Sequence, residues 1–315
     1  MINLALVGVG KWGKNFLTTV DKVSDCRIKY VCAKTQNTLQ NLSDSFSKTI
    51  LYEELFEKKD LHGVIIASPA VTHFRMAYDF ISHGIPVLVE KPFTTNLIEA
   101  IKLENHATKL QVPLMVGHEF VYNPAFQVFK RILSEIGSVK YIYTEAGNYG
   151  PFRPDISCLW DWGPHDVAML IDLFQLLPQT VQAWITGEDI VIARLVFNKT
   201  VDAFININRL MHTKIRTFNA LSRKISIRYD EFAKQKLTFY SYQPVMNNSQ
   251  IKPMISYPDY DLTPALQKEV ETFVQIIQNR KHPNLTNGSH AVLVIKILEA
   301  LENSSNNSGK AIEIH

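Results

Sequence analysis

Near its N-terminus the chain reads Leu6-Val7-Gly8-Val9-Gly10-Lys11-Trp12-Gly13, in which three glycines have the spacing GxGxxG. The pattern is weak alone, but here it follows an apolar, strand-like run and opens a helical segment, the context that makes it specific. The first glycine permits a tight turn, the second lets the backbone approach a pyrophosphate, and the third lets helix and strand pack closely. Free N–H groups at the helix N-terminus can then bind the phosphates. The segment therefore predicts a dinucleotide site in a βαβ unit.

The first 120 residues continue this alternation of strand-like and helical segments. The short apolar runs, mostly β-branched, are residues 4–7, 28–32, 64–67, 87–89 and 114–116. Helical spacing of apolar residues appears at 16–22, 72–83 and 97–110. Continuous apolar runs are typical of strands that are buried on both faces of a parallel sheet. Residues 1–120 are therefore predicted to form a doubly wound, dinucleotide-binding Rossmann domain.

Beyond residue 120 the pattern changes, and from about residue 180 to 240 strand-like runs follow one another with little helix between them. Such runs predict an α+β domain over residues 121–315, with a large, mostly antiparallel open sheet. We expect one helix to begin at Pro164, a proline suited to the first helical position. Residues 241–262 are expected to form a long loop, and two helices and a short strand close the chain.

The end of the second expected strand bears on the choice of dinucleotide. An NAD-preferring domain usually carries an Asp or Glu about 20 residues beyond the last glycine. Here the chain reads Val31-Cys32-Ala33-Lys34-Thr35, without a carboxylate. Lys34 can meet the 2′-phosphate of NADP while Thr35 donates a hydrogen bond, or Lys34 is an ordinary solvated lysine. The sequence favours NADP, with NAD as the alternative.

Composition excludes several classes of protein. The 315 residues carry a net charge of +3 without a basic run, which argues against a nucleic-acid partner. No apolar run approaches the roughly 20 residues that span a bilayer, so no membrane partner is expected. The three cysteines form no CxxC pair and no His/Cys/Asp cluster has ligand spacing, so neither a disulfide framework nor a metal is implied. A reducing cytoplasm is the expected location.

Four further motifs make the pattern more specific. They are Ala67-Ser68-Pro69-Ala70-Val71-Thr72-His73, Val89-Glu90-Lys91-Pro92, Val116-Gly117-His118-Glu119 and Leu159-Trp160-Asp161-Trp162-Gly163-Pro164-His165-Asp166. Together they resemble the glucose–fructose oxidoreductase / inositol dehydrogenase / rhizopine-catabolism family, Gfo/Idh/MocA, over nearly the whole chain. The resemblance implies self-association through the sheet of the second domain, as a homodimer or homotetramer.

The resemblance also implies a catalytic set of Lys91, Asp161 and His165. Lys91 is expected to reach the nicotinamide ribose and the substrate hydroxyl, and Asp161 to orient the imidazole. Hydride transfer from a secondary alcohol needs a base for the hydroxyl proton, for which a histidine is suited. It also needs positive charge beside the developing oxyanion, which a lysine supplies. Asp166 directly follows the histidine, and Ala168 stands where many family members carry an acid, so no particular substrate follows.

The remaining expected site residues fall into two groups. The residues expected to bind the cofactor are Gly8, Gly10, Lys11, Trp12, Gly13, Lys34, Thr35, Ser68, Pro69, His73, Glu90 and Lys91. The residues expected to bind substrate are Lys91, His118, Asn123, Tyr149, Arg153, Trp162 and His165. Structural alternatives stay open for five of these: His118 and Asn123 can pack or hydrogen-bond internally, His73 can cap a helix, Arg153 can pair with a carboxylate, and Glu90 can have a structural role.

Together, the motifs and the resemblance predict an NAD(P)-dependent dehydrogenase or reductase. It is expected to transfer a hydride between the nicotinamide and a secondary hydroxyl or keto carbon of a sugar, nucleotide sugar or cyclitol. Fold does not fix function, so two alternatives stay open. One is a non-catalytic regulator that senses cofactor or sugar, and the other is an NAD-dependent glycoside hydrolase that oxidises its sugar transiently.

Overall fold

The computed structural model describes residues 1–136, 139–153, 156–198, 201–242 and 252–315. The chain divides into two compact units. The first comprises Met1–Tyr122 and Thr263–Ile295, and the second comprises Asn123–Leu262 and Lys296–His315. The change of unit after Tyr122 lies next to the boundary expected at residue 120, whereas the return of residues 263–295 to the first unit differs from the expected division.

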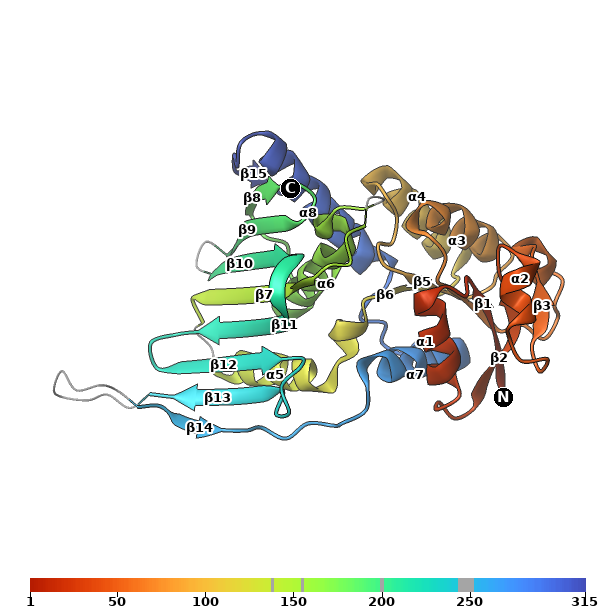
Figure 1. The fold of residues 1–315 in the computed structure, drawn as a ribbon, viewed down its shortest axis with the longest axis horizontal. Helices are drawn as coiled ribbons and strands as arrows, with labels where there is room; N and C mark the ends of the chain where they lie inside the picture. Colours follow the sequence, from red (N-terminus) through yellow and green to blue (C-terminus); the bar gives the residue numbers. More distant parts are fainter. Residues whose placement is uncertain (137–138, 154–155, 199–200, 243–251) are drawn as a thin grey trace. The chain divides into compact units, whose positions relative to one another are not determined.

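The first unit contains a parallel sheet of six strands in the order β3-β2-β1-β4-β5-β6 (Figure 1). The strands are β1 (Ile2–Val7), β2 (Cys26–Cys32), β3 (Ser47–Thr49), β4 (Gly63–Ile66), β5 (Val87–Glu90) and β6 (Leu114–Gly117). Strands β4, β5 and β6 are buried along their whole length, as their continuous apolar sequences predict. The predicted doubly wound sheet is therefore confirmed. Strand order reverses between β1 and β4, and ligands of such sheets bind at the carboxyl ends of the strands near this point.

Helices cover both faces of this sheet. Because each crossover is right-handed, connections that lead toward opposite edges of the sheet lie on opposite faces. They are α1 (Lys11–Val20), α2 (Gln36–Gln40), α3 (His73–Ser82), α4 (Leu97–Leu110) and α7 (Ala265–Gln278), with short 3₁₀ turns η1 (Tyr52–Leu55), η2 (Ala70–Thr72) and η3 (Glu119–Tyr122). Helix α3 ends before Gly84, whose φ of +74° suits a C-terminal glycine.

Helix α7 returns to the first unit because its apolar face is buried there. Phe273 is fully buried, and a Cβ built on Gly63 of β4 would lie 2.7 Å from Ile277 Cδ1. The segment after α7 also covers the edge of the sheet, since Val116 N donates to Thr286 O at 2.9 Å. An uncovered edge strand would expose unpaired backbone groups, so this returning segment completes the first unit.

The second unit contains, in its described residues, a sheet of nine strands in the order β14-β13-β12-β11-β7-β10-β9-β8-β15. The strands are β7 (Tyr141–Tyr149), β8 (Thr180–Thr186), β9 (Ile190–Phe197), β10 (Val201–Asn208), β11 (Leu210–Leu221), β12 (Ile225–Asp230), β13 (Leu237–Ser241), β14 (Met254–Ser256) and β15 (Ile312–Glu313). All neighbours pair antiparallel except β7 with β10. The predicted mostly antiparallel sheet is therefore confirmed.

The helices of the second unit are α5 (Pro124–Ile136), α6 (Cys158–Phe174) and the end of α8 (Gly288–Asn306). Helix α6 packs on β9 and β10. Residues alternate along β10, with Ala203, Ile205 and Ile207 buried and Phe204 36% exposed on the other face. The sheet is thus open on one face within a single chain, as antiparallel sheets commonly are.

Two local expectations were wrong. Helix α6 begins at Cys158 and not at Pro164, because Cys158 and Leu159 are buried and extend the helix upstream. Pro164 therefore lies inside the helix, where it offers no N–H to the carbonyl of residue 160. Of the expected loop 241–262, Met254–Ser256 forms β14, paired with β13, and residues 243–251 lie outside the described residues.

No helix in the described ranges combines the length and the apolar character that crossing a membrane requires.

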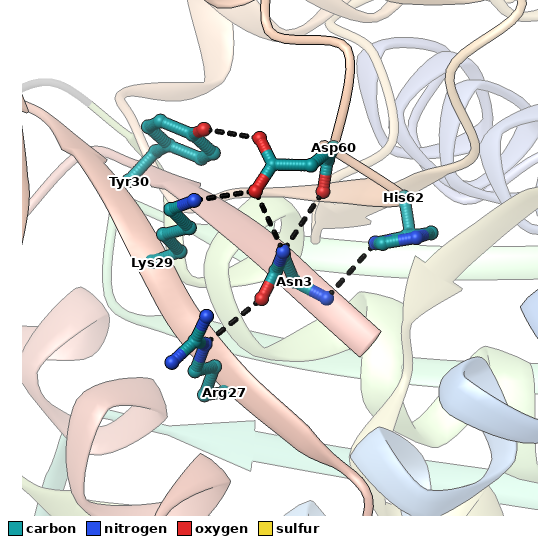
Figure 2. A network of polar contacts seen from close by, with 6 residues as sticks. All are labelled: Asn3, Arg27, Lys29, Tyr30, Asp60 and His62. Atoms are coloured by element: carbon teal, nitrogen blue, oxygen red, sulfur yellow. Dashed lines mark hydrogen bonds and ion pairs between the residues drawn. The ribbon is translucent and has the colours of Figure 1, made fainter. Parts of the chain in front are cut away.

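A polar network joins the start of β1, residues of β2 and the loop before β4 in the first unit (Figure 2). Its members are Asn3, Arg27, Lys29, Tyr30, Asp60 and His62. Asn3 Nδ2 donates to Asp60 Oδ2 at 2.9 Å, and Lys29 and Tyr30 donate to the same carboxylate. Hydrogen bonds from Lys29 and then Tyr30 lower the pKa of Asp60 to about 2. The network therefore needs Asp60 ionised.

We predict that Asp60→Ala lowers the melting temperature at pH 7 and has a shrinking effect as the pH falls. The folded-state pKa is depressed, so the stabilisation is present above the unfolded value near 3.8 and is lost towards about 2. Calorimetric melting temperatures of wild type and variant at pH 7 and pH 3 would measure this. Glu57→Ala, an exposed carboxylate on the same loop, is the control, and an Asp60 effect independent of pH would contradict the prediction.

Candidate functional site

The glycine turn between β1 and α1 contains two glycines that packing requires. Gly8 has a φ of +96°, and a Cβ there would lie 2.7 Å from the backbone of Ala67. A Cβ on Gly13 would lie 2.0 Å from Gly8 O. Helix α1 therefore approaches the end of β1 at a distance that no other residue type allows at these two positions.

Gly10 is different, because the fold itself leaves room for a side chain there. A Cβ on Gly10 would meet nothing within 4 Å, and the residue is exposed. It is the N-cap of α1, without a side-chain cap and without an acidic residue in the first turn. Uncapped N–H groups and the positive end of the helix dipole favour an anion. The open space at Gly10 thus fits the pyrophosphate of a dinucleotide.

Lys34 and Thr35, which follow β2, differ in their contacts. Thr35 is the N-cap of α2, and its Oγ1 accepts from Thr38 N at 3.4 Å. This gives Thr35 a structural role in addition to the expected contact with cofactor. Lys34 is exposed, and within the described residues it has no hydrogen bond or ion pair. Its ammonium is available to a phosphate.

The segment after β4 is linked to the segment after β5 by His73. His73 is 1% exposed at the start of α3, and its Nδ1 lies 2.8 Å from Pro92 O while its Nε2 lies 2.9 Å from Ser68 O. Burial lowers the pKa of His73, with the two carbonyls acting in the opposite direction. The structure does not show the helix cap that was one expected alternative, since the ring instead holds two backbone segments together. Pro69 is exposed beside them.

Glu90, the last residue of β5, contacts the glycine turn. Trp12 Nε1 donates a hydrogen bond to Glu90 Oε1, and Lys91 N donates to Glu90 Oε2 at 3.1 Å. Lys91 itself is half-buried at the carboxyl end of β5. Because Lys11 and Trp12 begin α1, the structure brings the glycine turn and the Glu90-Lys91 segment together at the same edge of the sheet.

Two buried groups lie near this edge. Glu269 of α7 is fully buried, and burial, then Glu90 and Glu119, raise its pKa well above the usual value. His118, 1% exposed after β6, has its pKa lowered by burial, then by His290 and Lys91. Among the residues that the structure describes, neither ring nitrogen of His118 has a hydrogen-bond partner. Sequence reasoning missed Glu269, although its position among the apolar residues Leu266, Val270 and Phe273 is a signal for a buried acid.

Asn123 has a structural explanation. Its Oδ1 accepts from Ala125 N at 3.0 Å at the start of α5, and its Nδ2 donates to Glu231 Oε2 at 2.8 Å. The side chain is 2% exposed. These contacts favour the internal role over the substrate-binding role that the sequence left open.

The second unit carries Asp161 and His165 on α6, where both are buried. Their i, i+4 spacing puts them on the same face of the helix. Since α6 starts at Cys158, His165 lies about two turns inside the helix and not in its first turn. Trp162 lies between them in sequence and is half-buried.

Asp161 is held by two arginines. Its Oδ2 accepts from Nη2 of the fully buried Arg209 at 3.1 Å, and its Oδ1 lies 3.5 Å from Arg153 Nη1. The carboxylate that the sequence left open as a partner of Arg153 is therefore Asp161. Sequence reasoning missed Arg209, which continues the inward-facing alternation of Ala203, Ile205 and Ile207.

Two further residues of α6 and β7 differ in their surroundings. Asp166 is fully buried and pairs with Arg216 at 3.0 Å, and burial raises its pKa. Tyr149, at the end of β7, is 70% exposed and makes an edge contact with Phe152. Tyr149 thus has surface to offer a ligand, whereas Asp166 is committed to the interior. In the described parts of the chain, no three His, Cys, Asp or Glu side chains are arranged to hold a metal ion.

Comparison with known proteins gives the context of this site. Residues 2–118 match the profile of the GFO_IDH_MocA oxidoreductase family with an NAD-binding Rossmann fold. An NADP(+)-dependent scyllo-inositol 2-dehydrogenase of Bacillus subtilis is 26% identical over 69% of this chain and 71% of its own length. A UDP-N-acetylglucosamine 3-dehydrogenase of Acidithiobacillus ferrooxidans is 32% identical, but the match spans only 39% of either chain. Matches to several curated relatives likewise span less than two thirds of their lengths.

Solved structures match over more of the chain. A protein from Magnetospirillum magnetotacticum described as an oxidoreductase is 29% identical, with a TM-score of 0.85 over 95% of this chain and 99% of its own. The structure of the Acidithiobacillus ferrooxidans enzyme has a TM-score of 0.86 at 20% identity, over 97% and 98% of the two chains. At that identity the second match shows the fold alone.

We predict that Gly10→Val lowers dinucleotide affinity at least about tenfold while the protein stays folded. The added side chain meets no protein atom close to its Cβ but occupies the space beside the helix N-terminus. Calorimetric titration with NADPH and melting curves would measure both effects. Gly13→Ala is the matched control, since its Cβ overlaps Gly8 O and should lower the melting temperature. Unchanged affinity in a folded Gly10→Val protein would place the phosphate site elsewhere.

Proposed function

Because the chain belongs to the Gfo/Idh/MocA family of oxidoreductases, we propose that it is an NADP-dependent dehydrogenase or reductase of a sugar, nucleotide sugar or cyclitol. The observation that carries the proposal is the open space at Gly10, at the uncapped N-terminus of α1. Lys91 follows β5 in the same unit and at the same edge of the sheet. A phosphate site and a lysine at this edge are what a nicotinamide enzyme of this fold needs.

The proposed catalytic residues are Lys91, Asp161 and His165. The nicotinamide, when bound, accepts or donates the hydride. The Lys91 ammonium stabilises negative charge that develops on the substrate oxygen. His165 takes or returns the hydroxyl proton. Asp161 orients His165 from one turn earlier on α6, and its pairing with Arg209 holds the carboxylate in place.

Three observations support NADP as the preferred cofactor. Lys34 is exposed at the end of β2 and has no partner within the described residues. The residues around it, Val31 to Thr35, include no carboxylate, which would repel a 2′-phosphate. The scyllo-inositol dehydrogenase named above also uses NADP(+).

We also propose that the open sheet face of the second unit joins copies of this chain into a homodimer or homotetramer. Trp184, Ile192 and Phe204 expose 48%, 43% and 36% of their surfaces there. Trp184 and Ile192 are direct register partners on β8 and β9, so the apolar surface is continuous. Large side chains gathered on an exposed face mark an interaction surface.

The proposed activity is tested by incubating the protein with NADP⁺ or NAD⁺ and a panel of sugars, nucleotide sugars and inositols, including scyllo-inositol and UDP-N-acetylglucosamine. Absorbance of reduced cofactor reports turnover. A protein that binds NADPH tightly but reduces no cofactor with any compound would favour the sensor. A protein that copurifies with its cofactor and hydrolyses a glycoside, without reduced cofactor accumulating, would favour the glycoside hydrolase that oxidises its sugar transiently.

We predict that NADPH binds more tightly than NADH, and that Lys34→Ala removes about tenfold of NADPH affinity through loss of a charge-assisted contact to the 2′-phosphate. NADH affinity should stay nearly constant, because NADH lacks that phosphate. Titration of the intrinsic tryptophan fluorescence with both cofactors measures the ratio. Equal affinities that the substitution does not change would make Lys34 a surface lysine.

We predict that Lys91→Ala and His165→Ala each lower kcat at least about a hundredfold, the lower range for a positioned acid–base group. Their affinities for NADPH should change much less, since the pyrophosphate is held at the glycine turn. Steady-state kinetics with a substrate from the panel and NADPH titration separate the two effects. Turnover near the wild-type rate in the double variant would remove both residues from the mechanism.

A further inference from the structure

One side chain connects the glycine turn with the segment that carries Lys91. Trp12 is the second residue of α1, directly after the position where the pyrophosphate fits, and its indole N–H donates to Glu90 Oε1. The other oxygen of Glu90 accepts from the backbone N–H of Lys91 at 3.1 Å. The Glu90 carboxyl therefore forms a continuous hydrogen-bonded path from Trp12 to Lys91.

The fold makes space for this carboxyl and holds it in place. Glu90 is 6% exposed, and its register partner on β6 is Gly117. A Cβ on Gly117 would lie 3.0 Å from Glu90 Oε1 and 3.1 Å from Cδ. A larger residue at 117 would push the carboxyl off its position over the sheet. Close packing on this side and two hydrogen bonds on the other leave the carboxyl little freedom to move.

Burying a carboxyl group at this position costs free energy. Burial raises the pKa of Glu90 to about 8, with Lys91 opposing the shift and Glu119 adding to it. The buried Glu269 of α7 lies near enough for Glu90 and Glu119 to raise its pKa in turn. Buried carboxyls near one another cost free energy that an apolar residue would not. Packing alone therefore does not explain Glu90, whereas its acceptance of two N–H bonds does.

Pro92, the residue after Lys91, is also held by a hydrogen bond. Pro92 O lies 2.8 Å from Nδ1 of His73, whose Nε2 contacts the segment after β4. Lys91 thus stands between two neighbours that are both held by buried hydrogen bonds. Of these two sets of hydrogen bonds, only the set made by Glu90 connects to the glycine turn.

We propose that Glu90 is a positioning residue that transmits the position of Trp12 at the glycine turn to Lys91. This inference rests on the proposed function in taking Lys91 as the group that acts on substrate. A dinucleotide bound at Gly10 would lie beside the first turn of α1 and would restrict the position of Trp12. The hydrogen bonds through Glu90 would then restrict the position of the Lys91 backbone. Glu90 then acts on turnover without touching the reacting atoms.

The first test needs neither cofactor turnover nor a substrate. The rate at which the Lys91 amine reacts with isotope-labelled acetic anhydride is measured by mass spectrometry, with the exposed Lys34 as internal reference. The variants are Trp12→Phe, which keeps an aromatic ring but has no N–H donor, Glu90→Gln, whose single amide oxygen can accept from only one of the two N–H groups, and the double variant. Each single variant should speed the reaction at least about threefold, and the double variant should add nothing further, because both changes break the same path.

Glu302→Gln is the matched control. Glu302 accepts an indole hydrogen bond from Trp160 at 3.0 Å in the second unit, so the same kind of bond is weakened elsewhere. Its Lys91 rate should equal that of wild type. An unchanged Lys91 rate in either single variant, or rate increases that multiply in the double variant, would overturn the proposal.

The second test uses a substrate from the panel and separates positioning from binding. Both single variants should lower kcat about tenfold or more, since small misplacements of catalytic groups are costly, and change the KM for NADPH less than about threefold. A raised KM with unchanged kcat would show a role in cofactor binding and overturn the proposal. If no compound is turned over, the proposed function fails, while the labelling result still decides whether Glu90 positions Lys91.

Discussion

The close approach of α1 to the end of β1 is the constraint on which the first unit depends. Gly8 and Gly13 have no room for a side chain, so the helix begins directly above the strand. This places the uncapped helix N-terminus at the carboxyl edge of the sheet, where the dipole favours an anion. It also fixes Trp12 within reach of Glu90. The proposed phosphate site and the contact between Trp12 and the Glu90-Lys91 segment therefore both depend on one backbone contact.

The second unit meets a different constraint, which is the burial of charge on α6. Asp161 pairs with Arg209, and Asp166 with Arg216, all four being buried. Breaking either pair would leave an uncompensated buried charge, which is strongly destabilising. The two pairs fix α6 to the residue between β10 and β11 and to the middle of β11, so the helix cannot rotate freely about its axis. The face that carries Asp161 and His165 is thus set by ion pairs as well as by apolar packing.

The first unit is completed by residues far along the chain. Helix α7 contributes Glu269 to its interior, and the segment after α7 bonds to β6. The buried carboxyls Glu90 and Glu269 come from segments far apart in the sequence, and they interact only because α7 returns. A stability or activity study of the first 122 residues alone would lack both the edge cover of the sheet and one partner of this pair.

The sequence by itself determined most of the local elements of both units, but not the start of α6 or the strand β14. The glycine spacing, the continuous apolar runs of β4 to β6 and the alternation of β10 each record a periodicity that short-range geometry imposes. Candidate chemistry such as Lys91 and His165 was also visible in motifs, which name residue types in order. Only the tertiary structure decided that α7 belongs to the first unit, that Arg209 holds Asp161, that Asn123 is committed to Glu231, and that Glu90 joins Trp12 to Lys91. The physical reason is that periodicity reports which face of an element is buried, whereas a buried charge is satisfied by a partner whose distance along the chain the sequence does not specify.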